Sequence, residues 1–281
     1  MKALTFLASR FVAGDRLDEA MRVVRELNAE GLKVTLDHLG EECRSPDQAE
    51  ADCNEYLEML RRISETGADC NVSLKLTQFG LNLGDAIAKE NLYQVLEAAR
   101  KLDIFVRIDM EGSAYTQKTL DIFYALQGDF PSVGVVIQAY LKRSRGDVEE
   151  LVRRRVRVRL CKGAYKEPAD IAFASKGDVN RNYDELAKLL VHAPLPAFAT
   201  HDDARIDAAC AAAEAAGLRK GGFELQMLYG LRPKRWRQLR EQGHSVRVYL
   251  PYGTHWMPYF YRRLRERKEN MLFVVKSLVS G

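Results

Sequence analysis

Two adjacent arginines near the C-terminal end of the sequence have the type and spacing to hold a small anion. Tyr259, Arg262, Arg263 and Glu266 stand at i, i+3, i+4 and i+7. On a helix, this spacing gathers a ring, two guanidinium groups and a carboxylate on one face. A guanidinium group is shaped to bind a carboxylate through two parallel hydrogen bonds. The pattern therefore predicts an anion clamp, with a solvated basic stripe as the alternative.

The rest of the chain must supply a frame for this clamp, and eight short β-rich segments alternate with amphipathic stretches. The segments are 33–37, 71–76, 104–109, 133–138, 156–162, 196–200, 223–227 and 246–250. Such alternation predicts parallel βαβ units. The number eight favours a closed (β/α)8 TIM-type barrel over an open doubly wound sheet.

Polar residues mark seven of the eight segment ends. The residues at or just after these ends are Asp37 with His38, Lys75, Asp109, Gln138, Lys162, His201, Gln226 and Pro251. Barrel active sites are assembled from the C-terminal ends of the strands. We therefore expect a functional rim at that end.

Size and composition are those of one ordinary globular domain. The chain has 281 residues, of which 47% are hydrophobic and 29% charged. We expect a single barrel over residues 1–281, with an N-terminal helical segment over 1–30. C-terminal helices are expected over 255–281, including a rim helix over the barrel mouth. No interdomain linker interrupts the series.

Charge and cysteine content exclude several classes of protein. The net charge of +4 is too mild to indicate nucleic-acid binding, although it would not repel an anionic membrane surface. Five scattered cysteines without a C-x-x-C pair favour a reducing cytoplasm. No stretch approaches the length of a membrane span, and the start lacks a signal-peptide pattern.

Three motifs at the expected rim carry further chemistry. In VRLCKGAY (158–165), small residues let the backbone approach a ligand and Lys162 can neutralise phosphate. Arg159 lies within that strand and needs a partner, because an unpaired buried charge is costly. In IDMEGS (108–113), Asp109 is the better candidate than Glu111, as the partner of Lys75 or Arg159.

Two further chemistries are weighed at these positions. His201 in ATHDD (199–203) is a possible metal ligand, but no H-x-H or H-E-x-x-H spacing accompanies it, so we expect no metal. Asp202 or Asp203 is placed to cap the next helix. Lys75 or Lys162 would form a Schiff base only if desolvation depressed its pKa.

Taken together, these stretches resemble the proline dehydrogenase family in its short monofunctional bacterial form. The matching segments are 35–41, 72–81, 106–113, 136–143, 158–165, 198–202, FELQMLYGLR (223–232) and YLPYGTHWMPYFYRRLRER (249–267). The likeness runs from about residue 10 to the C-terminus. The aldehyde dehydrogenase module of the bifunctional proline utilisation proteins is absent from the sequence.

The resemblance implies a distorted (β/α)8 barrel that holds FAD and oxidises L-proline to 1-pyrroline-5-carboxylate. A hydride would pass to the flavin, and electrons would pass on to a membrane quinone. This implies a cytoplasmic protein, peripheral on the inner face of the cell membrane. No G-x-G-x-x-G follows a strand, so a Rossmann-type cofactor site is not expected.

Carried over by residue, the resemblance also implies roles for the rim side chains. Arg262, Arg263 and Lys75 would bind the proline carboxylate, and Glu266 would brace their helix. The residues expected to enclose the substrate ring are Tyr165, Leu228, Tyr249 and Tyr259. Asp109 and Arg159 are the catalytic candidates, Asp109 by orienting the cations and Arg159 beside the flavin. The expected FAD-binding residues are Met110, Gln138, Arg159, Lys162, Gly163, Ala164, Thr200, His201 and Gln226.

The sequence departs from the family pattern in three places. Family members usually carry extra helices upstream of the first segment seen here, so the resemblance would make this chain a shortened version. Cys161 stands where the family often has Val, and Lys166 where some relatives have an aromatic residue.

Three other functions remain open from the sequence. A flavin dehydrogenase that prefers hydroxyproline is the nearest, with Tyr249 at the ring wall as the residue to examine. A Schiff-base lyase and a non-catalytic binding barrel belong to other classes. The sequence leaves oligomeric state, quinone identity and the acceptor of the amine proton undecided.

Overall fold

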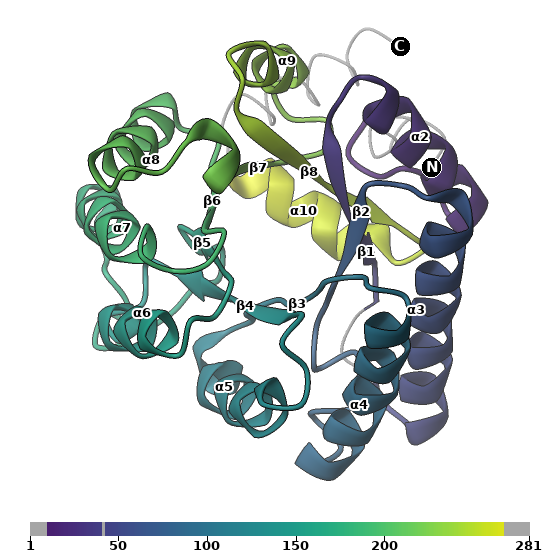
Figure 1. The fold of residues 1–281 in the computed structure, drawn as a ribbon. Coiled ribbons are helices and arrows are strands. Elements are labelled where there is room, and N and C mark those ends of the chain that lie inside the picture. The colour runs from purple at the N-terminus through teal and green to yellow at the C-terminus, as the bar shows by residue number, and fades with distance from the viewer. Residues whose placement is uncertain (1–9, 41–42, 267–281) are drawn as a thin grey trace, which may run out of the picture.

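The structure is a computed structural model that describes residues 10–40 and 43–266, and the side chains within 10–40 and 43–261. Within that part of the chain, eight parallel strands pair in sequence order and close into a barrel (Figure 1). The strands are β1 (Lys33–His38), β2 (Cys70–Leu74), β3 (Val106–Ile108), β4 (Val133–Gln138), β5 (Val158–Cys161), β6 (Ala197–Ala199), β7 (Glu224–Leu228) and β8 (Ser245–Tyr252). The predicted (β/α)8 barrel is confirmed.

Helices surround the barrel and connect its strands (Figure 1). They are α2 (Leu17–Ala29), α3 (Pro46–Thr66), α4 (Asp85–Lys101), α5 (Ser113–Gln127), α6 (Ser144–Arg153), α7 (Lys176–Leu190), α8 (Asp203–Ala215), the 3-10 turn η1 (Lys220–Gly222), α9 (Pro233–Glu241) and α10 (Trp256–Glu266). Local sequence sets their ends. Ser45 accepts a hydrogen bond from the Gln48 N–H at the start of α3, and Gly67 ends that helix in a left-handed conformation.

The predicted strand ends are displaced by one or two residues in several places. Lys75 and Asp109 follow β2 and β3 directly. Gln226 and Pro251 were expected at strand ends, and this was wrong: both lie inside strands that run on to Leu228 and Tyr252. Strand pairing with each neighbour carries β7 and β8 beyond the ends of their β-rich sequence runs.

Polar side chains occupy the barrel interior. Residues two apart on a strand share a face, so one set of alternate residues points into the barrel. Arg107, Arg159 and Arg247 are each at most 6% exposed. Arg107 passes over Gly134 on the neighbouring strand, where a Cβ would collide with the Arg157 carbonyl and the Phe105 ring. The opposite faces of the strands are apolar and pack against the helices.

The Glu224–Arg247 pair is the best satisfied of these interior charges. The Nε and Nη2 groups of Arg247 donate to the Glu224 carboxylate over 2.8–3.1 Å. Burial would raise the pKa of Glu224, but the Arg247 guanidinium outweighs burial and lowers this pKa to about 2. Arg247 Nη1 donates to the Val34 carbonyl, so the pair ties β7 and β8 to β1.

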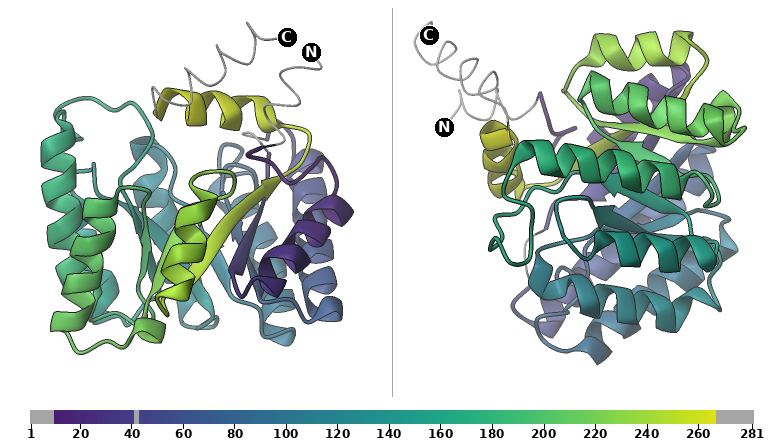
Figure 2. Two further views of the ribbon diagram at one scale, coloured as in Figure 1. Left: turned by 90° about the horizontal axis from the view of Figure 1, so that it is seen from above. Right: turned by 90° about the vertical axis from the view of Figure 1, so that its left-hand side faces the viewer.

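Helix α10 lies across the C-terminal end of the barrel (Figure 2, left). Its residues Tyr259 and Phe260 are buried in an apolar cluster with Phe11, Val12 and Leu39. This cluster is separate from the main core between barrel and helices. The rim helix is therefore seated on the N-terminal segment and on the loop after β1.

We predict that Glu224→Gln lowers the free energy of unfolding at pH 7 by about 3–5 kcal/mol, because it leaves Arg247 buried without its carboxylate. The folded-state pKa of Glu224 is depressed from 4.5 to about 2. The stabilisation is therefore fully present above pH 4.5 and is lost as the pH falls towards 2. Urea unfolding of wild type and variant between pH 7 and pH 3 measures the difference, which should shrink with acid.

The matched control is Glu185→Gln, which removes an exposed carboxylate paired with Lys188. Exposed ion pairs contribute little to stability because water screens them, so this variant should unfold almost as the wild type does. Equal losses in the two variants would show that the interior pair is not the stabilising feature.

Candidate active site

Asp109 is the centre of the polar network at the C-terminal end of the barrel. Its Oδ1 accepts a hydrogen bond from Arg159 Nη1 over 2.8 Å, and its Oδ2 accepts one from the Tyr249 hydroxyl over 2.6 Å. Lys75 Nζ lies 3.9 Å from the same Oδ2. Asp109 thus meets both cations that the sequence analysis offered as its partners.

Lys75 is held more tightly by Asp37, the residue before the end of β1. Its Nζ donates to Asp37 Oδ1 over 2.7 Å, and Asp37 is only 1% exposed. Burial alone would lower the pKa of Lys75, but the carboxylates of Asp37 and Asp109 raise it above its usual value. Lys75 is therefore an ammonium cation at neutral pH. Burial raises the pKa of Asp37, against the attraction of Lys75.

Arg159 connects strands across the barrel interior. Its Nε donates to Gln226 Oε1 over 2.6 Å, and its Nη2 donates to Ser73 Oγ over 3.1 Å. Its guanidinium carbon lies 5.1 Å from the centre of the Tyr249 ring. Groups from β2, β7 and β8, together with Asp109 after β3, thus fix the cation in one orientation, and Arg159 is 5% exposed.

The loops after β3, β4 and β5 lie side by side. Gln138 ends β4, and its Nε2 donates to the carbonyls of Met110 and Glu111. The turn after β5 begins with Lys162, whose Nζ donates to Asp202 Oδ2 over 2.7 Å. The next residue, Gly163, has a φ of +103°, and a Cβ there would collide with the Tyr140 ring.

The end of that turn stands at the surface. Ala164 is exposed, and half-buried Tyr165 packs against the cluster of Tyr140, Leu141 and Ala172. Tyr165 is also among the groups within electrostatic range of Lys75.

Thr200 and His201 follow β6 and contact β7. Thr200 Oγ1 accepts a hydrogen bond from the Asp202 N–H, and Asp202 Oδ1 caps α8 by accepting from the Ala204 N–H. His201 Nε2 accepts from the Leu228 N–H over 2.9 Å. Among the described residues no group of three metal-ligating side chains comes together.

The clamp on α10 is only partly visible. Tyr259 is 6% exposed and packs in the cluster that seats the helix, with half-buried Leu228 against the same cluster. The backbone at Arg262 and Arg263 belongs to α10, but their side chains and that of Glu266 lie outside the described residues. The helix itself crosses the C-terminal end of the barrel (Figure 2, left).

Several network residues were not proposed as site residues from the sequence. Asp37 was noted only as a strand end, and Ser73 and Glu224 were not singled out. Ser73 stands two residues before Lys75 and Glu224 stands two residues before Gln226, whereas Asp37 has no proposed site residue at that spacing. Polar residues at a spacing of two were the signal that would have found Ser73 and Glu224.

Comparison with known proteins decides the family. The family model described as "Proline dehydrogenase" matches residues 20–276. The chain belongs to the proline dehydrogenase family. It is 40% identical over 273 residues to proline dehydrogenase 1 of Bacillus subtilis subsp. natto, covering 97% of this chain and 90% of that one. It is 37% identical to proline dehydrogenase of Deinococcus radiodurans, covering 98% of this chain and 91% of that one.

A solved structure supports the same conclusion. Proline utilization A from Bdellovibrio bacteriovorus, inactivated by N-propargylglycine, superimposes with a TM-score of 0.87 at 28% identity. The match covers 92% of this chain and 32% of that larger chain, so this chain spans about a third of it. The predicted resemblance is confirmed, and with it the expectation of an oxidoreductase of proline catabolism.

We predict that Asp37→Asn lowers the pKa of Lys75, because the carboxylate that stabilises the ammonium form is replaced by a neutral amide. NMR titration of protein carrying 13Cε-labelled lysine follows this group directly. The control Asp202→Asn removes the carboxylate partner of Lys162 and should leave the pKa of Lys75 unchanged. A Lys75 pKa that is the same in Asp37→Asn and wild type would contradict the assignment.

Proposed function

We propose that this chain is an FAD-dependent proline dehydrogenase that oxidises L-proline to 1-pyrroline-5-carboxylate and passes the electrons to a membrane quinone. The reaction removes a hydride from the ring carbon next to nitrogen and a proton from the nitrogen, leaving a C=N bond. The observation that carries the proposal is the fixed cationic pair of Lys75 and Arg159 on shared Asp109, beneath the rim helix of a proline dehydrogenase barrel.

Substrate binding is assigned to the cations at the mouth. Lys75 remains protonated in its carboxylate environment and is available to the carboxylate of an amino acid. Arg262 and Arg263 are proposed as the double clamp above it. A small zwitterion offers few contacts, so several fixed cations supply much of the orientation that hydride transfer requires.

The walls of the substrate site are assigned to Tyr165, Leu228, Tyr249 and Tyr259. Aromatic and aliphatic surfaces exclude water and fit a five-membered ring by area. The Tyr249 hydroxyl is already committed to Asp109, and burial together with Asp109 raises its pKa. Tyr249 therefore stays neutral and presents its ring as a wall.

Residues of the β4–β7 side fit a dinucleotide. The Gly163 backbone adopts a conformation that favours glycine and lies against Tyr140, so small residues border the turn that Lys162 begins. Met110, Gln138, Lys162, Gly163, Ala164, Thr200, His201 and Gln226 are proposed to hold FAD, together with Arg159. When bound, FAD supplies the hydride acceptor.

The network also prepares the charge of the site before reaction. Arg159 is held by Asp109, Gln226 and Ser73, so its position does not need to reorganise when negative charge develops nearby. The Gln226 side-chain amide accepts a hydrogen bond from Arg159 and donates one to Glu224. The Gln138 side chain donates to backbone carbonyls. They act by fixing other groups of the site.

The pKa of Lys75 argues against the Schiff-base lyase. A lysine nucleophile needs a depressed pKa, whereas the pKa of Lys75 is raised by Asp37 and Asp109. Lys162 is engaged with Asp202. Proline is favoured over hydroxyproline because the Tyr249 hydroxyl is committed to Asp109 and leaves an aromatic wall.

Transfer of electrons to a quinone implies contact with a membrane surface, which we propose to be peripheral and on the inner face of the cell membrane. Within the described residues no helix has the length and apolar content of a membrane span.

We predict that the purified protein is yellow and that its visible absorption bleaches when L-proline is added without oxygen. The physical reason is the transfer of two electrons from proline to bound flavin. The optical spectrum before and after addition measures it, with D-proline as the control. A colourless protein that cannot be reconstituted with FAD, or a spectrum that L-proline leaves unchanged, would overturn the proposed function.

We predict that Arg263→Met raises KM for L-proline by roughly two orders of magnitude, because a charge-assisted contact with a desolvated carboxylate contributes about 2–5 kcal/mol. FAD content should be unchanged. The control is Arg265→Met, whose spacing places it off the face shared by residues 259, 262, 263 and 266. Equal KM values for the two variants would remove Arg263 from the clamp.

A further inference from the structure

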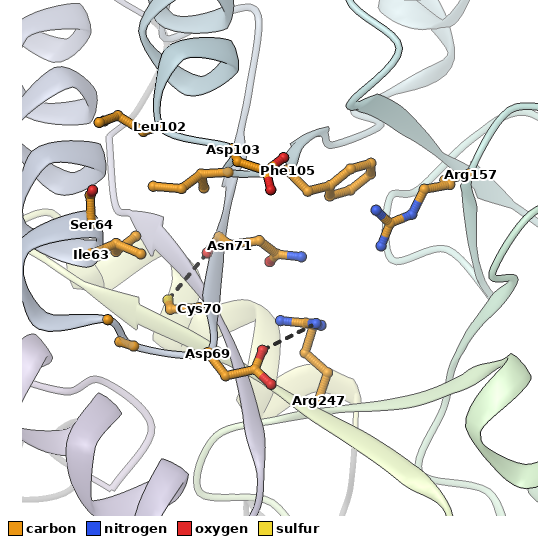
Figure 3. Close-up of a pocket in the computed structure, with 13 residues that line it drawn as sticks. Ile63, Ser64, Asp69, Cys70, Asn71, Leu102, Asp103, Phe105, Arg157 and Arg247 are labelled. Atoms are coloured by element: carbon orange, nitrogen blue, oxygen red, sulfur yellow. Dashed lines mark hydrogen bonds and ion pairs between the residues drawn. The ribbon is translucent and has the colours of Figure 1, made fainter.

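The opposite end of the barrel holds a second group of arginines that the proposed reaction does not use. A cavity of about 430 Å³ opens there, among the loops that precede β2, β3 and β5. Its lining includes Asn71, Phe105, Arg157 and Arg247 (Figure 3). Because these residues stand at the N-terminal ends of their strands, the cavity lies a full strand length from Lys75 and the rim helix.

Arg157 is the least satisfied of these cations. Its Nε is buried without a hydrogen-bond partner in the described residues, and no described carboxylate lies within ion-pair distance of its guanidinium. The guanidinium carbon lies 3.8 Å from the centre of the Phe105 ring. Burial lowers the pKa of Arg157, while the Glu224 carboxylate raises it and the nearby Arg247 lowers it.

Arg107 adds positive charge behind the same ring. It is 1% exposed, its guanidinium carbon lies 4.7 Å from the Phe105 ring centre, and its Nη1 donates to the Arg157 carbonyl. Its Nε also lacks a partner among the residues described. Burial and the neighbouring Arg159 and Arg157 lower the pKa of Arg107 well below its usual value.

Nearby carboxylates leave part of this charge uncompensated. Glu224 is hydrogen-bonded by Arg247 and Gln226; it also acts electrostatically on Arg107 and Arg157 but forms no ion pair with them in the described structure. Asp69 lies 3.8 Å from Arg247 and is more than half exposed. Asp103 lines the rim of the cavity but forms no ion pair with these arginines in the described structure. An anion in the cavity would relieve the repulsion among the guanidinium groups.

The donors converge on a common space. Asn71 Oδ1 accepts from the Thr35 hydroxyl, so the Asn71 NH2 group is the end turned to the cavity, and Figure 3 shows it facing Arg157 and Arg247. Arg247 donates from Nη1 to the Val34 carbonyl and from Nη2 to Glu224, and each of these nitrogens carries a second N–H. Two guanidinium groups and an amide are a donor set suited to the oxygens of a small anion.

We propose that this basal cavity, lined by Asn71, Arg157 and Arg247, binds a small oxyanion, either phosphate or the carboxylate of a metabolite. The site is separate from the substrate clamp and does not rest on the proposed function. Its occupancy stabilises the arginine-rich end of the barrel.

Thermal unfolding of the full chain loaded with FAD tests this, since loading fills the proposed phosphate-binding turn. At about 10 mM, sodium phosphate should raise Tm by about 3–5 °C over sodium chloride of equal ionic strength. The Arg157→Gln variant should lose this shift and keep kcat/KM within about two-fold of wild type. The control Arg153→Gln, on the exposed end of α6, should keep the shift.

Two further measurements make the outcome decisive. Sodium acetate, compared with phosphate, identifies which oxyanion is preferred, and no rise in Tm with either overturns the proposal.

Asp69→Asn removes the rim carboxylate beside Arg247, so calorimetric titration with the preferred anion should show about three-fold tighter binding. If Arg157→Gln does not fold, this variant decides: an affinity equal to or weaker than wild type contradicts the site.

Discussion

The ion pair of Asp109 with Arg159 is the interaction on which the architecture of the site depends. One carboxylate receives Arg159 and the Tyr249 hydroxyl and lies near Lys75, so groups from two strands and the residue after a third converge on it. A buried charge without a partner is costly, and each of these groups therefore restricts the positions of the others. The closed barrel makes this possible because parallel strands bring their C-terminal ends to one place.

The same constraint governs the interior below the site. Most barrels fill this space with branched apolar side chains, whereas this one places Arg107, Glu224 and Arg247 there. Glu224 is engaged by Arg247 and, through Gln226, is connected to Arg159. A continuous polar network thus extends from the catalytic end towards the base. At the C-terminal end of the barrel the cations Lys75 and Arg159 lie beside the Asp109 carboxylate. At the N-terminal end Arg157 has no ion-pair partner among the described residues.

Much of this could be read from the sequence. The alternation of β-rich and amphipathic segments was sufficient for the barrel, and residues at strand ends such as Lys75 and Asp109 were found from their position alone. Gln226 was placed at a strand end and lies inside β7, because pairing with β8 extends the strand past its β-rich run. Ser73 and Glu224 were missed, and their spacing of two from Lys75 and Gln226 was the one local sign that they share a face with those residues. Which cation takes which carboxylate depends on contacts between distant strands, which no local pattern contains.

Helix α10 is anchored differently from the remaining helices. Its buried residues Tyr259 and Phe260 belong to a small apolar cluster with Phe11 and Val12, apart from the main core. Among the described side chains of α10, the buried ones pack in this cluster and not in the core between the strands and the other helices. Elements held by few apolar contacts open at a fraction of the global unfolding free energy. We therefore expect the cover of the mouth to open more readily than the barrel beneath it, where Asp109 and its cations lie.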